Sequence, residues 1–388
     1  MLLKIHKKDR RKGGSGRLMK KLIPILLVLL LFITACNNSR VEAVPPATAS
    51  PTISIKPSYS PTPSPTPSLS PSPTPTPTPY NGPVNPLTGL PTTVDLSGKR
   101  PLAIMLNNIK EALPQHGTAS ADIIYETLAE GGITRMLAIY QSTDNIDRIG
   151  SIRSARPYFL DLAQGLDAIY IHAGGSPQAY EAISSRGVCN IDGVRGNYEI
   201  FYRDRERAGG GYAYEHTLFS TGELLDEYLP TYNIRTDHQE GYAYAMRFSE
   251  QPDSLSGLAA QTINVHFSNY KTGVFTYDEL SMMYKVSQYG AEYKDGNTGD
   301  QVSVKNVLVL HAPVSRIPND TEGRLSIDLV GSGTGLFACE GKYIPVIWSK
   351  DGYSSSFLYT LEDGTELSFG RGTSYICIIP ENEQVDIS

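Results

Sequence analysis

Short apolar runs alternate with helix-like stretches in the first half of the folded sequence, which begins near Tyr80. Four apolar runs predict buried strands at residues 102–106, 121–125, 136–140 and 168–172. Apolar positions at helical spacing predict helices at residues 158–166, 177–184 and 223–229. Ser220 and Glu223 have the spacing of a capping box, which favours a helix start there. Strands that alternate with helices indicate an α/β layer.

The second half of the chain keeps the strand pattern and loses the helical one. Strand-like runs separated by Gly-, Asn- and Asp-rich turns lie at residues 261–268, 273–277, 282–287, 301–310, 325–329, 342–348, 355–361 and 373–379. The sequence therefore predicts an α+β or α/β fold. A layered N-terminal domain of mixed sheets and helices, residues 81–245, precedes a smaller β-rich C-terminal domain, residues 258–384. The boundary is expected between residues 240 and 260.

A short apolar segment near the N-terminus has the order of an export signal. Residues 22–33 are apolar, follow Lys20 and Lys21, and are too few to span a bilayer comfortably. The next residues complete Ile33-Thr34-Ala35-Cys36, which resembles the bacterial lipobox, where the Cys thiol receives a diacylglycerol and the preceding bond is cut. We therefore predict a signal peptide at residues 1–35 and lipidation at Cys36, the alternative being an uncleaved anchor helix or a core helix.

A spacer rich in Pro, Ser and Thr follows at residues 36–80. Proline at every second position, as in residues 61–67 and 71–79, removes amide donors and fixes φ, so the segment favours an extended polyproline II conformation. At about 3.1 Å per residue, such a spacer could reach on the order of 100 Å if stiff. We expect it to hold the folded part away from the membrane, outside the cytoplasm.

Charge and cysteine content narrow the classes of partner. The net charge is −6 for the whole chain, and removing residues 1–35 would take away nine basic residues and one acidic residue, leaving −14. Such acidity disfavours nucleic acid as a partner and leaves membrane contact to the acyl chains. Cys189, Cys339 and Cys377 show no metal-ligand spacing, so we expect no metal and no cofactor. They are interpreted as small buried residues, with a Cys339–Cys377 bridge as the alternative.

Several motifs occur in an order that resembles a known family. They are Asn85-Pro-Leu-Thr-Gly-Leu90, Ala121-Asp-Ile-Ile-Tyr-Glu126, Ala129-Glu-Gly-Gly-Ile-Thr-Arg135, Ile152-Arg-Ser-Ala-Arg-Pro-Tyr158 and His172-Ala-Gly-Gly-Ser-Pro-Gln-Ala-Tyr180. Together they resemble the YerB-like family of bacterial lipoproteins over residues 83–380. The resemblance implies a surface lipoprotein of unknown molecular function with a layered α/β N-terminal part. It supplies no catalytic residue.

Two strand-to-helix junctions carry the candidate chemistry. Arg153 and Arg156 precede the helix expected after Pro157, where free amide groups and two guanidinium groups would attract an anion. The second junction, His172 to Ser176, holds Gly174 and Gly175, which permit close backbone approach, and Ser176, which could cap the helix or bind a ligand. Ligands of α/β folds collect beyond the carboxyl ends of strands, so we expect the two junctions to form one pocket.

Each candidate has a structural alternative. Arg153 or Arg156 could pair with Asp161, Asp167 or Glu126, and His172 could be a buried structural residue. Glu126 and Glu130 could act as an acid–base pair on a glycosidic bond, but we prefer to interpret them as solvated turn charges, because the separation of the two carboxylates cannot be read from the sequence.

The leading hypothesis is a lipid-anchored envelope protein that binds an anionic or polar ligand, a cell-wall component or a protein partner, and that is not an enzyme. One alternative is an envelope hydrolase acting on a glycan or phosphodiester, with Glu126 or Glu130 and His172 as acid–base groups. Another is a structural adaptor for a membrane complex.

Overall fold

The computed structural model describes residues 80–196 and 198–388. The predicted signal peptide, the lipidation site Cys36 and all of the predicted spacer except Tyr80 lie outside the described residues. Within the described part of the chain, no helix is long and apolar enough to cross a membrane.

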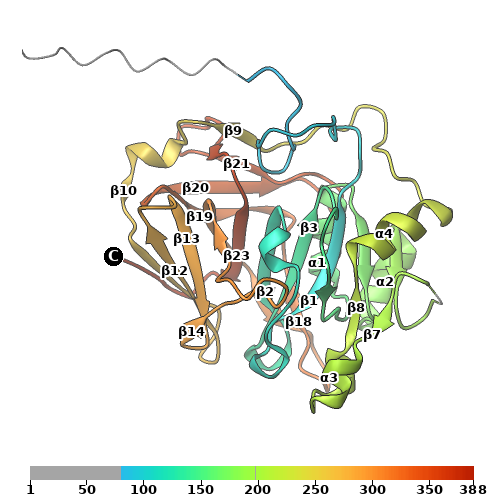
Figure 1. Cartoon of the computed structure of the whole chain (residues 1–388). Coiled ribbons are helices and arrows are strands. Elements are labelled where there is room, and N and C mark those ends of the chain that lie inside the picture. The colour runs from blue at the N-terminus through green and yellow to red at the C-terminus, as the bar shows by residue number, and fades with distance from the viewer. Residues whose placement is uncertain (1–79, 197) are drawn as a thin grey trace, which may run out of the picture. The chain divides into compact units, whose positions relative to one another are not determined.

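One large mixed sheet of 11 strands runs through the molecule (Figure 1). Its strands, in order across the sheet, are β10 (Leu258–Ala259), β20 (Lys342–Lys350), β19 (Gly331–Cys339), β16 (Asn306–Ala312), β23 (Ser374–Pro380), β2 (Ile123–Leu128), β3 (Thr134–Tyr140), β1 (Leu102–Asn107), β5 (Ile169–His172) and β6 (Asn190–Asp192), and β21 (Leu358–Thr360) pairs with β20. Both halves of the chain therefore contribute to one sheet.

The two halves meet where β2 pairs in parallel with β23, with Tyr125 opposite Ile376. Every residue of β2 is buried, as is every residue of β23 except the last. A strand covered on both faces must be apolar along its length, which explains the continuous apolar runs in the sequence. The domain boundary expected between residues 240 and 260 is therefore a change in composition, because strands from both sides of it belong to one sheet.

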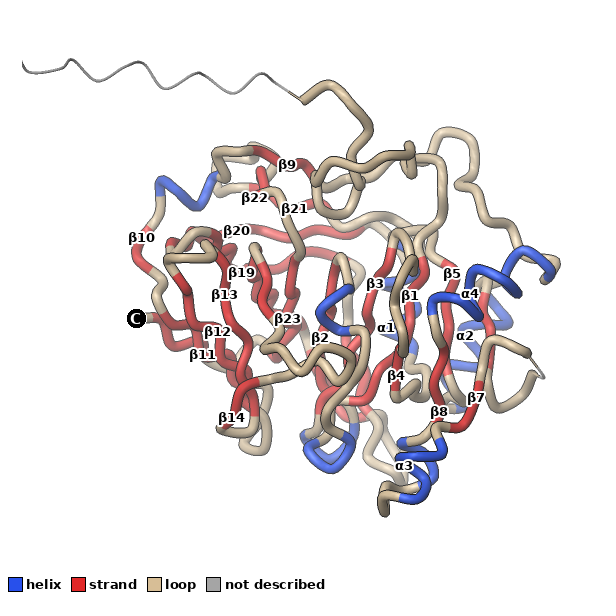
Figure 2. The backbone as a smooth tube through the Cα atoms, viewed as in Figure 1, coloured by secondary structure: helices blue, strands red, loops and turns tan. Residues whose placement is uncertain are grey.

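Helices cover the part of the sheet built by the first half (Figures 1 and 2). Helix α1 (Pro157–Gly165) precedes β5, and α2 (Pro177–Arg186) connects β5 to β6. Strands β1, β5 and β6 pair in parallel, so their carboxyl ends lie at the same edge of the sheet. This arrangement is what positions the candidate site.

The second half adds a six-stranded antiparallel sheet. Its strands are β14 (Ala291–Glu292), β13 (Met283–Gln288), β12 (Thr272–Asp278), β11 (Thr262–His266) and β24 (Val385–Ile387), and β15 (Ser303–Val304) pairs with β13. Burial alternates along β11, as expected of a sheet with one buried face. Three smaller sheets complete the strands: β17 (Val314–Arg316) with β18 (Leu325–Ile327), β22 (Ser368–Gly370) with β9 (Arg247–Ser249), and β4 (Ile149–Gly150) with β8 (Leu218–Ser220) and β7 (Tyr202–Arg203).

The predicted fold class is confirmed: mixed sheets carry the structure, and the α-helices among the described residues all lie in the first half. The remaining two are α3 (Arg205–Gly209) and α4 (Gly222–Tyr228). One local prediction is wrong, because Thr221 rather than Ser220 caps α4 by accepting a hydrogen bond from the amide of Leu224 at 3.0 Å. Strand β19 was not predicted, since its glycines, at 331, 333 and 335, hide the strand pattern.

The cysteines of the folded part are free. Cys339 ends β19 and Cys377 lies within β23, and both are buried. Cys189, just before β6, is partly exposed. The interpretation as small buried residues holds for Cys339 and Cys377.

Candidate functional site

A hollow of about 490 Å³ lies beyond the carboxyl ends of β5 and β6. Its walls come from the loop before α1, the turns after β5 and β6, strand β7 and the short helix at Tyr214–His216. The hollow is lined by Arg153, Gly174, Val194, Arg203, Tyr214 and Glu215, among others. We call this hollow the Arg153 pocket.

Backbone hydrogen bonds place the two strand-to-helix junctions side by side. The amide of Ala155 donates to the carbonyl of Gly174 at 2.9 Å, and the amide of Ser176 donates to the carbonyl of Ala155 at 3.3 Å. Ala155 and Gly175 form a parallel bridge. The loop that carries Arg153 is therefore fixed against the glycine turn.

Arg153 is the least satisfied group of the pocket. Its Nη1 donates to the backbone carbonyl of Glu215 at 3.2 Å, while its Nε is buried and has no hydrogen-bond partner in the structure. Burial lowers the pKa of Arg153 and the Glu215 charge opposes this, but a guanidinium remains charged at neutral pH. A buried N–H donor without a partner costs free energy, which an acceptor on a ligand would recover.

Arg203 supplies a second guanidinium from β7. Its Nη1 donates to the carbonyl of Tyr214 at 2.8 Å, and its Cζ lies 3.9 Å from the centre of the Tyr214 ring. Within the described residues, neither Arg203 nor Arg153 forms an ion pair with a carboxylate at 4.0 Å or less. Two cations without carboxylate partners therefore face one pocket, and the carboxylate of Glu215 lies at its exposed rim.

Gly174 shapes the floor of the pocket. Its φ of +73° lies in the left-handed region, which glycine adopts without strain. The amides of Gly174 and Val194 both donate to Oδ1 of Asp192, at 2.7 and 2.9 Å. Burial alone would raise the pKa of Asp192, but these two amide bonds and the Tyr180 hydroxyl outweigh it and lower the pKa. Asp192 is thus a charged support beneath the turn.

Two of the predicted site residues are structural. His172 is fully buried, and its ring nitrogens lie 2.8 Å from the carbonyl oxygen of Gly174 and 3.0 Å from Oδ1 of Asn190. Ser176 is also buried, and its hydroxyl caps α2 by accepting from the amide of Ala179 at 3.1 Å. Neither side chain lines the pocket, because local hydrogen bonds hold both inside the turn.

Arg156 differs from Arg153 because it forms an ion pair with a carboxylate. Its guanidinium binds Oε1 of Glu130, and Arg135 lies 3.5 Å from Oε2 of the same carboxylate. Burial would raise the pKa of Glu130, but the charges of Arg135 and Arg156 outweigh it and lower the pKa. The ion-pair alternative therefore describes Arg156, with Glu130 as its partner and none of the three carboxylates expected.

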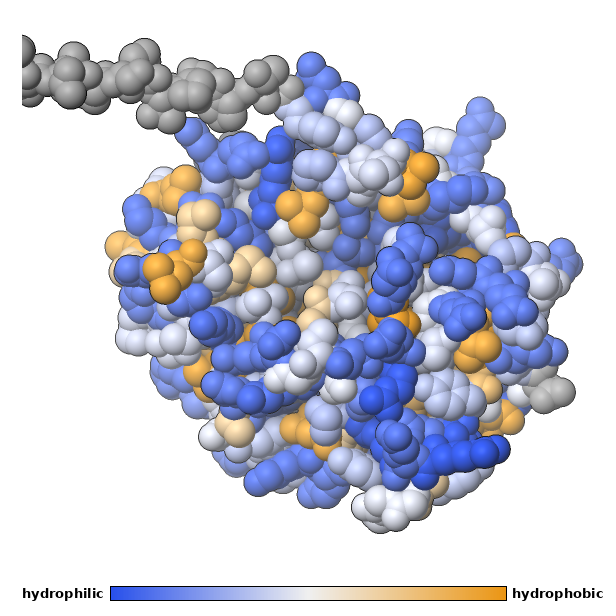
Figure 3. Space-filling view, viewed as in Figure 1, coloured by the Kyte–Doolittle hydropathy of each residue, from blue (hydrophilic) through white to orange (hydrophobic). Residues whose placement is uncertain are grey.

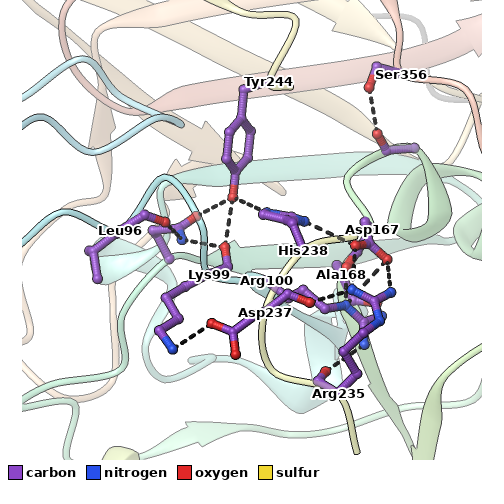
Figure 4. Close-up of polar contacts among 12 residues, drawn as sticks. Leu96, Lys99, Arg100, Asp167, Ala168, Arg235, Asp237, His238, Tyr244 and Ser356 are labelled. Atoms are coloured by element: carbon purple, nitrogen blue, oxygen red, sulfur yellow. Dashed lines mark hydrogen bonds and ion pairs between the residues drawn. The ribbon is translucent and has the colours of Figure 1, made fainter. Parts of the chain in front are cut away.

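The expected carboxylate partners are used elsewhere. Asp161 binds Arg186 at 2.5 Å. Asp167 is the centre of the polar cluster in Figure 4, where it accepts from Arg235 at 2.7 Å and lies 3.0 Å from Nδ1 of His238. This cluster joins the turn after α1 to the segment between α4 and β9 and contains no residue of the Arg153 pocket.

Glu126 lies in the core, away from the pocket. It is 1% exposed, and its Oε1 accepts from Asn108 at 2.7 Å while its Oε2 accepts from Tyr375 at 2.5 Å. Glu130 comes after the end of β2, so the two carboxylates do not share a strand face. The hydrolase alternative requires acid–base groups that a substrate can reach. In the described geometry Glu126 and His172 are both buried, so they do not form such a pair.

A second hollow differs in charge. It is larger, about 610 Å³, and is lined by Asp144, Asp147, Glu223 and Asp226 among others. These carboxylates would repel an anion. Within the described residues, no group of three or more His, Cys, Asp or Glu side chains is placed to hold a metal ion.

Sequence reasoning missed Arg203, Tyr214, Glu215 and Asp192. They lie on short elements between α2 and β8, and no periodic pattern marks them. The only available signal was the position of Asp192 directly after a short apolar stretch, where a third strand would end at the same edge.

The fold and site define a mixed α/β protein with an N-terminal and a C-terminal part that share one sheet. The chain matches the family models described as the N-terminal and C-terminal domains of a protein of unknown function, DUF3048, over residues 87–235 and 263–376. It is 30% identical to the Bacillus subtilis (strain 168) protein named "Putative lipoprotein YerB" over 311 residues, which cover 78% of this chain and 88% of that one.

The crystal structure of the YerB protein from Bacillus subtilis is similar. It superimposes with a TM-score of 0.67 at 28% sequence identity, covering 78% of this chain and 99% of that chain. The chain therefore belongs to the YerB-like DUF3048 family.

Proposed function

We propose that this protein is a lipid-anchored binding protein of the cell envelope and that its Arg153 pocket takes an anionic group. Support for the anchor comes from the lipobox-like residues that end at Cys36 and from the lipoprotein name of the Bacillus subtilis relative. Support for the ligand comes from the pocket itself. The glycine turn, the loop before α1 and strand β7 surround a hollow large enough for a small ligand.

The unpaired Nε of Arg153 carries this proposal. Buried donors are normally satisfied by protein or by water, and an exception calls for a partner. A phosphate or carboxylate oxygen would accept from this Nε, while Arg203 would neutralise the same group from the other wall. Because both guanidinium groups are already held in place, their side chains would lose little conformational entropy when the ligand binds.

Calorimetric titration with inorganic phosphate, sugar phosphates and soluble cell-wall fragments tests the ligand site. We expect Arg153→Gln and Arg203→Gln each to weaken binding roughly ten-fold or more, since a hydrogen bond to a charged group contributes about 1.5–3 kcal/mol. Arg205→Gln is the control, because Arg205 is exposed and lies outside the pocket. If all three variants bound the probes as the wild type does, or if no probe bound, the assignment of this pocket would be wrong.

The anchor is tested separately. We expect the wild-type protein to fractionate with membranes in a bacterial host and to release a lipid-modified N-terminal peptide on digestion. Cys36→Ala removes the thiol that would carry the lipid and should move the protein to the soluble fraction. A Cys36→Ala protein that stays with the membrane would contradict lipid anchoring.

A further inference from the structure

Four side chains form a closed ring of polar contacts in the core between the two halves. Oε1 of Glu126 accepts from Nδ2 of Asn108 at 2.7 Å and lies 3.2 Å from Nζ of Lys271. Nε2 of Gln288 donates to Oδ1 of Asn108 at 2.9 Å, and Oε1 of Gln288 accepts from Nζ of Lys271. A single carboxylate oxygen thus joins an amine to the nitrogen of a side-chain amide.

The ring is isolated from water. The four residues are between 0% and 3% exposed. Aromatic rings border the amine, with the ring centres of Tyr289 and Phe267 at 5.0 and 5.8 Å from Nζ of Lys271. Burying a charged lysine ammonium in such an apolar environment costs free energy, which favours the neutral amine.

We propose that Lys271 and Asn108 join spontaneously through an isopeptide bond between Nζ and the side-chain Cγ of Asn108, with Glu126 as the proton carrier. This would be a covalent modification site within the folded protein, independent of the Arg153 pocket.

The reaction needs no oxidant, reductant or further reactant. Glu126 takes one proton from Nζ, which leaves a neutral amine and a neutral carboxylic acid. The amine lone pair attacks Cγ of Asn108 and a new C–N bond forms. The C–Nδ2 bond then breaks, the leaving nitrogen takes the proton from Glu126 and one from Nζ, and it departs as an ammonium ion. One amide replaces another, and Glu126 is a carboxylate again.

Each member of the ring has a position that suits this step. Glu126 touches both the nucleophile and the leaving nitrogen, as a proton carrier must. Gln288 donates to the oxygen of Asn108 that becomes negative during the attack, while its own carbonyl holds the amine. Burial lowers the pKa of Lys271 and the Glu126 charge opposes this, so the amine form gains in population.

The bond would fasten the two halves of the chain to each other. Asn108 follows β1, and Lys271 lies in the turn between β11 and β12. A covalent link between residues so far apart in sequence restricts the unfolded chain, as a disulfide does. For a protein exposed outside the cytoplasm with free cysteines, such a link would replace disulfide bonds as a covalent brace.

A tryptic map of the denatured wild-type full chain tests the proposal directly. Modified Lys271 resists trypsin, so residues 248–285 should stay in one piece and be joined to residues 100–110, with a mass lower by one ammonia than the two together. Lys350 is the internal control. It is buried and its pKa falls to about 8, but it bonds only to the backbone carbonyls of Tyr353 and Ser355, so normal cleavage is expected there.

Variants assign the roles. We expect Lys271→Arg and a folded Glu126→Gln protein to give only linear peptides, the first without the nucleophile and the second without the proton carrier. Complete recovery of residues 248–271 and 100–110 as separate, unmodified wild-type peptides would overturn the proposal. A link from Lys271 to residues 286–294, which contain Gln288, would overturn the choice of Asn108. The wild-type map requires no variant to fold.

Discussion

The hydroxyl of Tyr375 donates to Oε2 of Glu126 at 2.5 Å and thereby joins β23, near the end of the chain, to β2 in the first half. Both residues are about 1% exposed. A buried carboxylate is tolerated only when its oxygens are hydrogen bonded, so this contact helps to decide whether the shared sheet is stable.

Tyr375→Phe removes this hydroxyl without changing the ring. We expect the free energy of unfolding to fall by about 1.5–3 kcal/mol, the range for a hydrogen bond to a charged group. Urea unfolding followed by fluorescence measures this change. Tyr353→Phe is the control, because Tyr353 is 51% exposed, and it should change stability by under about 0.5 kcal/mol. Equal effects of the two variants would contradict the role given to Tyr375.

Glu130→Gln should destabilise the protein in a pH-dependent way. Because the pKa of Glu130 is lowered in the folded state, its charge stabilises the fold at pH values above its unfolded pKa, and this contribution disappears as the pH falls through the folded pKa. We expect a loss of about 2–3 kcal/mol at pH 7. The difference from the wild type should shrink below about pH 4.

Denaturant unfolding at several pH values checks the Glu130 prediction. Glu206→Gln is the matched control, since the Glu206 side chain is 88% exposed and lies 3.4 Å from Arg148. A Glu130→Gln difference that stayed constant from pH 7 to pH 3 would show that its charge is not the cause.

Gly174→Ala and Gly175→Ala should differ, although the residues are adjacent. Gly174 has a φ of +73°, where an alanine costs about 1–2 kcal/mol. Gly175 has no such conformation, and a Cβ there would meet the nearest side-chain atom at 3.4 Å, an ordinary contact. Thermal unfolding should therefore show a clear loss for Gly174→Ala and little change for Gly175→Ala. The reverse order would contradict the described turn.

The cysteines should react in the order of their exposure. Cys189 is partly exposed, whereas Cys339 and Cys377 are buried, and burial raises the pKa of Cys339 to about 12. Brief treatment of the native protein with iodoacetamide should label Cys189, and labelling of the other two should require unfolding. Peptide mass mapping identifies the sites. A disulfide between Cys339 and Cys377 in the untreated protein would contradict the structure.

The sequence predicted correctly those strands whose residues are selected by burial alone. The runs at 102–106 and 136–140 became β1 and β3 because strands covered on both faces must be apolar throughout. Helix α2 was also predictable, since Ser176 caps its start and Gly187 ends it with a positive φ. These are local rules, and neighbouring residues suffice to apply them.

The site depended on contacts between distant residues. Arg153 and Arg156 are three residues apart and have the same chemistry, but Glu130 binds Arg156, and Arg153 keeps an unpaired Nε. Arg203, 50 positions further on, supplies the second cation of the pocket. A linear pattern cannot tell which of two arginines a carboxylate will meet, because that choice depends on how the loops pack.

The sequence by itself determined many of the strands, the helices α1, α2 and α4, the lipobox-like signal with its Pro-rich spacer, and the two junctions that hold the candidate residues. Only the tertiary structure decided that β23 lies between β16 and β2, that His172 and Glu126 are buried, and that Lys271 and Asn108 both contact Glu126 in the core. The physical reason is that apolar burial and backbone capping act over a few residues, whereas ion pairs, pockets and strand order depend on which distant segments share the core.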